Sequence, residues 1–367
     1  MEHEEVYRAL ARRLDEIPNG FPTTVSGVEL RVLAHLFHPE EAALAVHLRL
    51  TPEPASTIAQ RAGHDGKATH ALLKGMAKRG LIRAERGERD LLFGLMPWVV
   101  GIYEMQGGRL DTKLAELVEA YFHEGMPDLL RVKPALHRVI PIEQAVRPGV
   151  EILPYERASE VVNQAAAWGV VNRLCREQQR LVGRGCDRPL DVCMVMSSTP
   201  GFFEGSPAIR SLTRGQAMDT LRRAEEAGLV HSVGNTRDLA ESLGKGVWYM
   251  CNCCACCCGI LRGVAELGIR HSVAWSGFRA VVDETLCTGC EACQERCHFG
   301  ALSMADGLCR VDHDRCAGCG LCCGECPSEA LALERRPAEQ IEPLVPDMRT
   351  WWEERAKARS IDIGKVL

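Results

Sequence analysis

Two short stretches near the C-terminus carry four cysteines each at the same spacing. Residues 287–298 and 316–327 both follow C-x₂-C-x₂-C-x₃-C, the bacterial pattern for cubane iron–sulfur clusters. Three thiolates two residues apart can cover one face of a cube on a tight loop, and the fourth reaches the other cluster from the following helical turn. Two [4Fe–4S] clusters are therefore predicted. The expected ligands of cluster one are Cys287, Cys290, Cys293 and Cys326, and those of cluster two are Cys316, Cys319, Cys322 and Cys297.

The second stretch repeats the first with an offset of 29 residues. The flanks follow the same shift, since Val282-Asp283 corresponds to Val311-Asp312. Such a repeat predicts a duplicated unit of strand, cluster loop, short helix and strand. The glycines at 289, 318 and 320 give the loops backbone freedom and let amides approach the sulfurs.

Residues 281–334 resemble the bacterial-type dicluster ferredoxins through these two motifs. One position departs from the pattern, because His298 stands where a proline usually follows the fourth cysteine, whereas Pro327 keeps it in the second motif. We expect this change to leave the cluster in place and to alter its potential. A zinc ribbon is the alternative, but its C-x₂-C pairs lie far apart. Cys309 and Cys323 fall outside the ligand pattern and are expected to be buried, inert thiols.

A second sulfur-rich region has the sequence CNCCACCC at 251–258, with six thiols in eight positions. Adjacent side chains of an extended chain point to opposite sides, so these thiols cannot all bind one cubane. Dense free thiols would be prone to oxidation. We therefore expect at least one further iron–sulfur cluster, built by this segment with Cys186 and Cys193; zinc in a tetrahedral thiolate site is the alternative. The candidate metal ligands are Cys175, Cys186, Cys193, Cys251, Cys253, Cys254, Cys256, Cys257 and Cys258.

The use of cysteine also indicates a compartment. The chain has 19 cysteines in 367 residues, an odd number, and its acidic N-terminus lacks the basic and apolar regions of a signal peptide. A disulfide framework therefore fits poorly. The uncharged stretch 246–261 has 16 residues, fewer than the roughly 20 that span a membrane. We expect a cytoplasmic protein without a membrane span, in which clustered thiols bind metal.

Residues 26–96 carry no redox motif and predict a winged helix instead. EEAALAVHLRL is amphipathic and ends at Pro52 and Pro54, and STIAQRAG followed by GKATHALLKGMAKRGLI has the glycines of a helix–turn–helix. RAERGERDLLFGL then predicts a hairpin wing that turns near Gly87.

The positive charge of this region is compatible with binding to nucleic acid. Eight basic and four acidic residues from Ser56 to Met96 give a balance of +4. One hypothesis is a DNA-reading helix, but a protein-docking wing is favoured because the helix contains Gly75 and few side chains that read bases. Helix–turn–helix geometry alone does not establish DNA binding. The residues of the DNA hypothesis are Lys67, Thr69, His70 and Lys74.

The middle region, residues 111–245, mixes helix and strand. DTKLAELVEAYFHEG predicts one helix, and a second is expected from Thr213 and Gln216 in a capping box to Gly228. PLDVCMVM predicts a short buried strand. The sequence has no Walker loop, no dinucleotide-binding glycine pattern and no nucleophile elbow, and lone histidines such as His137 and His231 are expected to be surface or hydrogen-bonded residues. The tail contains a charged helix with two tryptophans, which we expect to pack against the body or a partner.

Over most of residues 25–334 the chain resembles a group of bacterial dicluster-ferredoxin proteins with an N-terminal winged helix and a CNCC-x-CCC segment. The matching stretches are LAHLFHPEEAALAVHLRLTPEP, AKRGLI, VVGIYEMQ, EILPYERASE, GRGCDRPLDVC and CNCCACCC. The group has a further cysteine two residues before the one that matches Cys175, and this chain has Arg173 there. The departure puts in question a cluster that uses Cys175. The resemblance implies electron transfer with a partner oxidoreductase.

These observations predict a multidomain α+β protein. The expected parts are a winged-helix-like domain (1–110), a mixed α/β domain with the Cys-rich site (111–280), the dicluster ferredoxin domain (281–334) and a helical tail (335–367). The expected function is relay of single low-potential electrons to or from a partner oxidoreductase. The alternatives are a reductase with a substrate-accessible Cys-rich site and a redox-sensing DNA-binding regulator. A homo-oligomer is compatible with the sequence.

Overall fold

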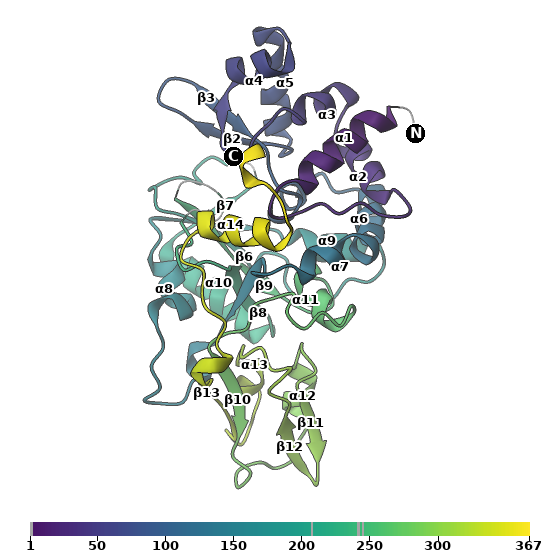
Figure 1. Ribbon diagram of the computed structural model, residues 1–367. Helices are drawn as coiled ribbons and strands as arrows, with labels where there is room; N and C mark the ends of the chain where they lie inside the picture. Colours follow the sequence, from purple (N-terminus) through teal and green to yellow (C-terminus); the bar gives the residue numbers. More distant parts are fainter. Residues whose placement is uncertain (1–2, 207, 241–242, 244–245) are drawn as a thin grey trace. The chain divides into compact units, whose positions relative to one another are not determined.

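The computed structural model describes residues 3–206, 208–240, 243 and 246–367. The fold is mixed α+β with several sheets (Figure 1), as the sequence predicts. The chain divides into two compact units, one formed by Met1–Lys133 with Trp352–Leu367 and the other by Pro134–Trp351. The first unit thus extends beyond residue 110, where a boundary was expected, because helix α6 (Thr112–Glu124) packs against α2 (Val28–Leu36). Among the described residues, no helix has the length and apolar character needed to cross a membrane.

The first unit is largely helical, with one small antiparallel sheet of order β1-β3-β2. Helix α4 ends at Gly63, whose φ is 67°, and α5 begins at the N-cap Asp65, whose carboxylate accepts the Ala68 N–H at 2.8 Å. The predicted helix–turn–helix and the hairpin after it are confirmed. The other elements are α1 (Glu4–Asp15), α3 (Pro39–Ala45), β1 (Glu53–Pro54), α4 (Ala55–Ala62), α5 (Gly66–Lys78), β2 (Arg83–Arg86), β3 (Leu91–Gly94), η1 (Trp98–Ile102), η2 (Glu104–Gln106), α7 (Met126–Arg131) and η6 (Ile363–Lys365).

The second unit is built on a six-stranded sheet of order β4-β8-β9-β6-β5-β7, in which every neighbouring pair is antiparallel. One face packs against helices α8 (Ala158–Asn163) and α10 (Arg214–Glu226). The predicted capping box of α10 is present, since Thr213 and Gln216 exchange hydrogen bonds of 2.9 and 3.2 Å. The strands are β4 (His137–Ile140), β5 (Ala167–Val171), β6 (Cys193–Ser197), β7 (Arg210–Leu212), β8 (Val230–Gly234) and β9 (Val247–Cys253).

Strand alternation sorts the side chains of the two central strands. Met194 and Met196 of β6, with Trp248 and Met250 of β9, point into the core beneath α8 and α10. Alternate residues of a strand face opposite sides of the sheet. Cys193, Cys251 and Cys253 therefore lie on the face away from those helices.

The two cysteine motifs form a pseudo-symmetric pair of half-units in the predicted order of strand, loop, short helix and strand. Gly289 and Gly318, which correspond in the repeat, have φ of 68° and 69°. A Cβ at either position would collide with a backbone carbonyl, that of Gly307 or Phe278 respectively, so both loops require glycine. The half-units are β10 (Phe278–Val282), α12 (Ala292–Arg296) and β11 (Leu302–Ala305), then β12 (Leu308–Val311), α13 (Leu321–Gly324) and β13 (Leu331–Arg335).

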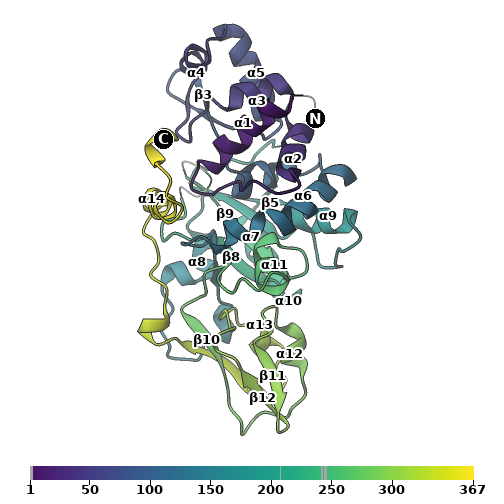
Figure 2. The same ribbon diagram turned by 45° about the vertical axis from the view of Figure 1, so that its right-hand side comes forward.

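The half-units are interlocked, because β10 pairs with β13 and β11 with β12. In both ribbon views the helices α12 and α13 lie on the side of this repeat that faces the large sheet, and the β11–β12 hairpin points away (Figure 2). The tail after it includes η5 (Ala338–Gln340) and α14 (Met348–Ala358). Trp351 is buried and donates to the Ala135 carbonyl at 3.1 Å, as expected for a packing residue.

Candidate metal centres

Four thiols from two segments converge into one compact group. The Sγ atoms of Cys186, Cys254, Cys256 and Cys257 all lie within 4.8 Å of one another. The distance is 4.0 Å between Cys186 and Cys254, and 3.7 Å from Cys257 to both Cys186 and Cys256. Among the residues that the structure describes, this is the group of metal-ligating side chains close enough to share one ion. These four residues, called the four-thiol group below, could bind a metal.

A turn directly after β9 assembles this group. The strand ends at Cys253, and the amides of Cys257 and Cys258 then donate to the Cys254 carbonyl at 3.4 and 3.0 Å. The turn replaces extended backbone, so Cys254, Cys256 and Cys257 can approach one another. The fourth thiol comes from the loop between α9 (Leu174–Leu181) and β6, where the Cys186 carbonyl accepts from the Arg180 guanidinium.

Two arginines donate to sulfurs of the four-thiol group. Arg176, which is fully buried, places Nη2 3.7 Å from the Cys254 sulfur and 3.0 Å from the Asn252 carbonyl. Arg188 places Nη1 3.8 Å from the Cys256 sulfur. Four thiolates around a divalent ion carry a net charge of −2, which two guanidinium groups offset. The electrostatic surroundings therefore suit an anionic metal–thiolate complex.

A second set of thiols surrounds Arg173. Its Nη1 donates to Cys193 at 3.0 Å, and its Nη2 donates to Cys253 at 3.0 Å and Cys258 at 3.4 Å. Two further thiols join through sulfur–sulfur hydrogen bonds, Cys175 to Cys258 and Cys251 to Cys193. We call these residues the Arg173 group, which comprises Arg173, Cys175, Cys193, Cys251, Cys253 and Cys258.

The two groups divide the cysteines named for the second sulfur-rich region. The sequence predicted at least one further cluster built by CNCCACCC with Cys186 and Cys193, and the structure places these two cysteines in different groups. The reason is the β-sheet. Met194 pairs with Met250 across β6 and β9, so Cys193 lies beside Cys251 on the strand face, whereas Cys186 meets the turn after the strand.

Charge is unevenly distributed within the Arg173 group. Burial raises the pKa of Cys193, but the hydrogen bond from Cys251 and the charge of Arg173 together bring it down to about 6. The pKa of Cys251 rises to about 12, mainly because of its hydrogen bond with Cys193. The pair therefore shares one proton at neutral pH, with the thiolate on Cys193 beside the guanidinium.

A buried histidine lies next to the Arg173 group. The Ser232 hydroxyl is 3.5 Å from the Cys253 sulfur and 3.4 Å from Nδ1 of His137. Burial lowers the pKa of His137 to about 4, so its ring is neutral at physiological pH. His231 is also buried, and its Nδ1 lies 2.6 Å from the Asn252 amide oxygen. Both histidines fit the expectation of hydrogen-bonded residues.

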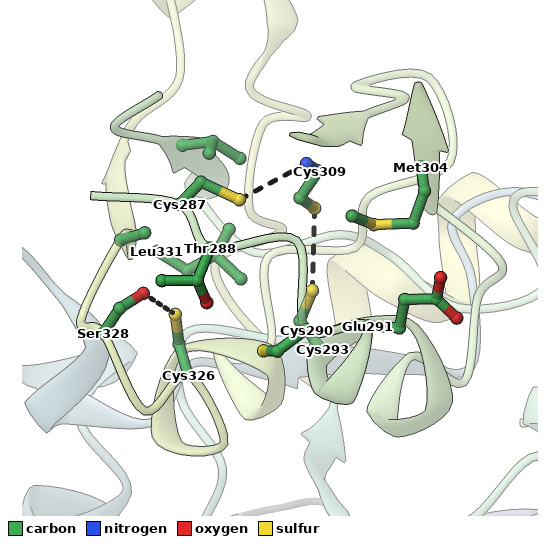
Figure 3. A pocket seen from close by; sticks show the side chains of 12 residues that line it. Cys287, Thr288, Cys290, Glu291, Cys293, Met304, Cys309, Cys326, Ser328 and Leu331 are labelled. Atoms are coloured by element: carbon green, nitrogen blue, oxygen red, sulfur yellow. Dashed lines mark hydrogen bonds between the residues drawn. The ribbon is translucent and has the colours of Figure 1, made fainter. Parts of the chain in front are cut away.

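The four thiols expected for cluster one line a single pocket in the repeat (Figure 3). Three come from the loop before α12 and its first turn, and Cys326 comes from the segment after α13 in the other motif. The Cys309 amide donates to the Cys287 sulfur at 3.4 Å. Cys290 is exposed and Cys293 is buried. The structure thus brings these four side chains together across the two motifs.

Cys309 lines the same pocket, although it lies outside the predicted ligand pattern. Its sulfur lies 3.6 Å from that of Cys293, because β12 passes over the first cysteine loop. Burial first, and the neighbouring Cys293 second, raise the pKa of Cys309 to about 12. A buried, protonated thiol agrees with the expected inert residue. Cys323, in contrast, is only partly buried.

The thiols expected for cluster two also share one neighbourhood. The amide of Ala280 donates to the Cys316 sulfur at 3.4 Å, and the amide of Ala301 donates to the Cys297 sulfur at 3.3 Å. Burial raises the pKa of Cys319 well above its usual value. The charges of three neighbouring thiols raise the pKa of Cys319 further, and these are Cys322, Cys297 and Cys316. Cys297, from the first motif, therefore lies with three cysteines of the second.

His298 connects the repeat to the sulfur-rich turn. Its Nε2 lies 2.7 Å from the Gly228 carbonyl, and its Nδ1 accepts the Ala255 N–H at 3.4 Å. Burial lowers the pKa of His298, in keeping with a neutral ring that donates from one nitrogen and accepts at the other. Arg296 donates beside it to the Glu226 carbonyl at 2.7 Å. The residue that departs from the ferredoxin pattern thus makes contacts that proline could not make.

The residues of the DNA hypothesis do not all face solvent. Lys67, His70 and Lys74 are exposed on α5, but Thr69 is buried at 2% exposure. Thr69 therefore packs inside the unit and cannot contact a base, because α5 turns that position toward the core.

Sequence reasoning missed the three arginines beside the thiols. A usable signal existed, because Arg173 and Arg176 flank Cys175 at the start of a helix and positions three apart share a helix face. No protein-family model, curated protein or solved structure matches the chain.

Proposed function

We propose that the protein is an iron–sulfur electron-transfer protein that relays single electrons to or from a partner oxidoreductase. The observation that carries the proposal is the position of Cys326, which lines one pocket with Cys287, Cys290 and Cys293 although it belongs to the other motif. A two-cubane repeat requires this exchange of the fourth ligand between motifs. A metal site formed by one motif alone would not need a ligand from the other motif.

The surroundings of the two sites support a relay. Cys290 is exposed at the first site, and Leu286, which precedes Cys287 in the chain, is 48% exposed, so a partner could approach that site closely. The second site is deeper, with Cys316 and Cys322 buried, and its ligand Cys297 precedes His298, which contacts the sulfur-rich turn. When bound, the clusters would supply one-electron redox chemistry. The chain's own residues would hold them, donate N–H groups to their thiolates and exclude water.

The outer surface of the repeat supports a charged docking mode. Residues 281–334 contain three basic and ten acidic residues, a balance of −7, and nine of the ten acidic side chains are exposed. We propose a redox partner with a basic patch, since complementary charge mainly raises the association rate.

Iron and acid-labile sulfide measured on the anaerobically purified full chain test the proposal. The two cubanes predict about eight irons and eight sulfides per chain from the repeat, and reduction should produce the EPR signals of reduced cubane clusters. Protein that is folded and metal-loaded but contains no acid-labile sulfide would disprove it.

A redox-sensing regulator is the second candidate. It is favoured by the exposure of Lys67, His70 and Lys74 on α5. Specific binding to the protein's own promoter that resists salt and changes with cluster oxidation would support this role. Binding that is lost with rising salt for every sequence tested would reject it.

A further inference from the structure

We propose that the four-thiol group holds one metal ion in tetrahedral thiolate coordination, without bridging sulfide. The ion is a thiophilic divalent cation, either zinc or ferrous iron. This assignment does not depend on the clusters proposed for the repeat, because it rests on different residues and different distances.

The sulfur–sulfur distances carry the inference. Metal–sulfur bonds of about 2.3 Å directed to the corners of a tetrahedron separate the sulfurs by about 3.8 Å. The distances observed in the four-thiol group are 3.7, 3.7 and 4.0 Å. In a cubane each thiolate ends on a different iron, which spreads the sulfurs farther apart. Among the described residues, the eight cysteines expected to bind cubanes form no group within 4.8 Å, which is the contrast that the two chemistries predict.

The site is closed, as in structural metal sites. It offers four sulfur donors and therefore leaves no open position for substrate. Val192, Ala224 and Leu229 pack around it, and Cys254 and Cys257 are buried. The ion would join the loop that carries Cys186 to the turn after β9. That turn contains Ala255, whose N–H is bound by His298 of the repeat, so the ion would also help to fix the contact with the repeat.

The Arg173 group provides the contrast within the same segment. Its guanidinium contacts three sulfurs at 3.0 to 3.4 Å and already supplies a cation to these thiols. In the four-thiol group, each arginine contacts only one sulfur, at 3.7 Å for Arg176 and 3.8 Å for Arg188. We therefore assign the ion to the four-thiol group and none to the Arg173 group.

The test compares metal and sulfide contents of the anaerobically purified full chain in matched cysteine variants. Cys186→Ser should lose one ion per chain and no acid-labile sulfide, whereas Cys175→Ser, in the Arg173 group, should keep that ion. Elemental analysis shows whether the lost ion is zinc or iron. Loss of several irons with an equal amount of sulfide from Cys186→Ser would overturn the single-ion assignment. Loss of the ion from Cys175→Ser but not from Cys186→Ser would place it in the other group.

A second variant keeps all four ligands in case Cys186→Ser does not fold. Arg188→Gln removes the donor to Cys256 and should weaken metal retention against a chelator about 10- to 100-fold, the usual effect of losing a group that hydrogen-bonds a ligand. Arg222→Gln, on the exposed face of α10, is the control and should retain metal like the wild type. Cobalt exchanged into the site should give the intense visible absorption of tetrahedral cobalt–thiolate. Failure of cobalt to give that absorption, with Arg188→Gln retaining metal like wild type, would reject the site.

Discussion

The repeat and the CNCCACCC segment both concentrate cysteine, but they organise it differently. In the repeat, two or three residues separate the successive cysteines expected as ligands, and the first site takes its fourth thiol, Cys326, from the other motif. In CNCCACCC the thiols are adjacent or one residue apart, and they divide between the four-thiol group and the Arg173 group. Wide spacing on a glycine-containing loop specifies a ligand set, whereas adjacent cysteines leave the direction of each thiol to the backbone.

The division within CNCCACCC follows from one change of backbone conformation. Cys251 and Cys253 lie on the extended part, β9, on the face of the sheet opposite α8 and α10. Cys254, Cys256 and Cys257 lie on the turn, and Cys258, the N-cap of α11 (Gly259–Ala265), returns to the Arg173 group. Two chemically different sites can therefore be made from one short segment.

The largest effect is expected from replacing a cysteine ligand in the repeat. Cys290→Ser and Cys319→Ser should each cost about four irons per chain, because each removes one expected ligand of a different proposed cubane. The four-thiol group should keep its ion in both variants. Iron, sulfide and zinc analysis with EPR measures all three quantities. Cys323→Ser is the control, and loss of a cluster from it while Cys322→Ser keeps both would show that the ligand register is wrong.

The next largest effect is expected from replacing a glycine in the cysteine loops of the repeat. Gly318→Ala adds a Cβ against the Phe278 carbonyl at a φ of 69°, and left-handed strain with overpacking should cost about 2–5 kcal/mol. Gly324→Ala is the matched control, since nothing lies within 4 Å of its Cβ. The midpoint of thermal unfolding and the cluster absorbance are the measurements. Equal behaviour of the two variants would contradict the tight packing of this loop.

A smaller effect, on the free energy of unfolding, is expected from replacing Arg173 in the Arg173 group. Arg173→Gln removes hydrogen bonds to ionised sulfur, which contribute about 1.5–3 kcal/mol. The folded pKa of Cys193, about 6, lies below its reference value of 9.0, so the thiolate's stabilisation is complete above pH 9 and is lost as pH falls toward 6. The difference in unfolding free energy between Arg173→Gln and wild type should therefore shrink from pH 9 to pH 6. Arg210→Gln, at an exposed ion pair with Asp191, should show no such trend; a constant difference for Arg173→Gln would refute a thiolate at Cys193.

The smallest effect is expected on the rate of association with the redox partner, through the acidic surface of the repeat. Glu295→Lys, exposed on α12, should slow association with the redox partner about two- to tenfold at low salt, without changing iron content. The effect should fade as salt rises, because screening shortens to about 8 Å at physiological ionic strength. Stopped-flow electron transfer measures the rate, and Glu339→Lys outside the repeat is the control. A wild-type rate that stays flat from low to high salt would exclude this docking mode.

The order of elements in the repeat and much of the secondary structure could be predicted from consecutive residues. The offset of 29 residues predicted the order of strand, loop, helix and strand, and the pairing of Cys326 with the first motif. The capping box at Thr213 and the helix–turn–helix before the hairpin were likewise readable. These features depend on local contacts or on a repeated pattern, both of which are written in consecutive residues.

Which thiols lie together could not be predicted from the sequence, because it depends on how distant segments pack. Cys186 and Cys193 are seven residues apart in sequence, yet one joins the turn after β9 and the other lies on the face of β6. The sequence also gave no sign that Arg173 would lie among five thiols, or that His298 would bind the turn beside them. Such contacts depend on strand register and on the direction in which a turn leaves a sheet, and both are set by the packing of segments far apart in the chain.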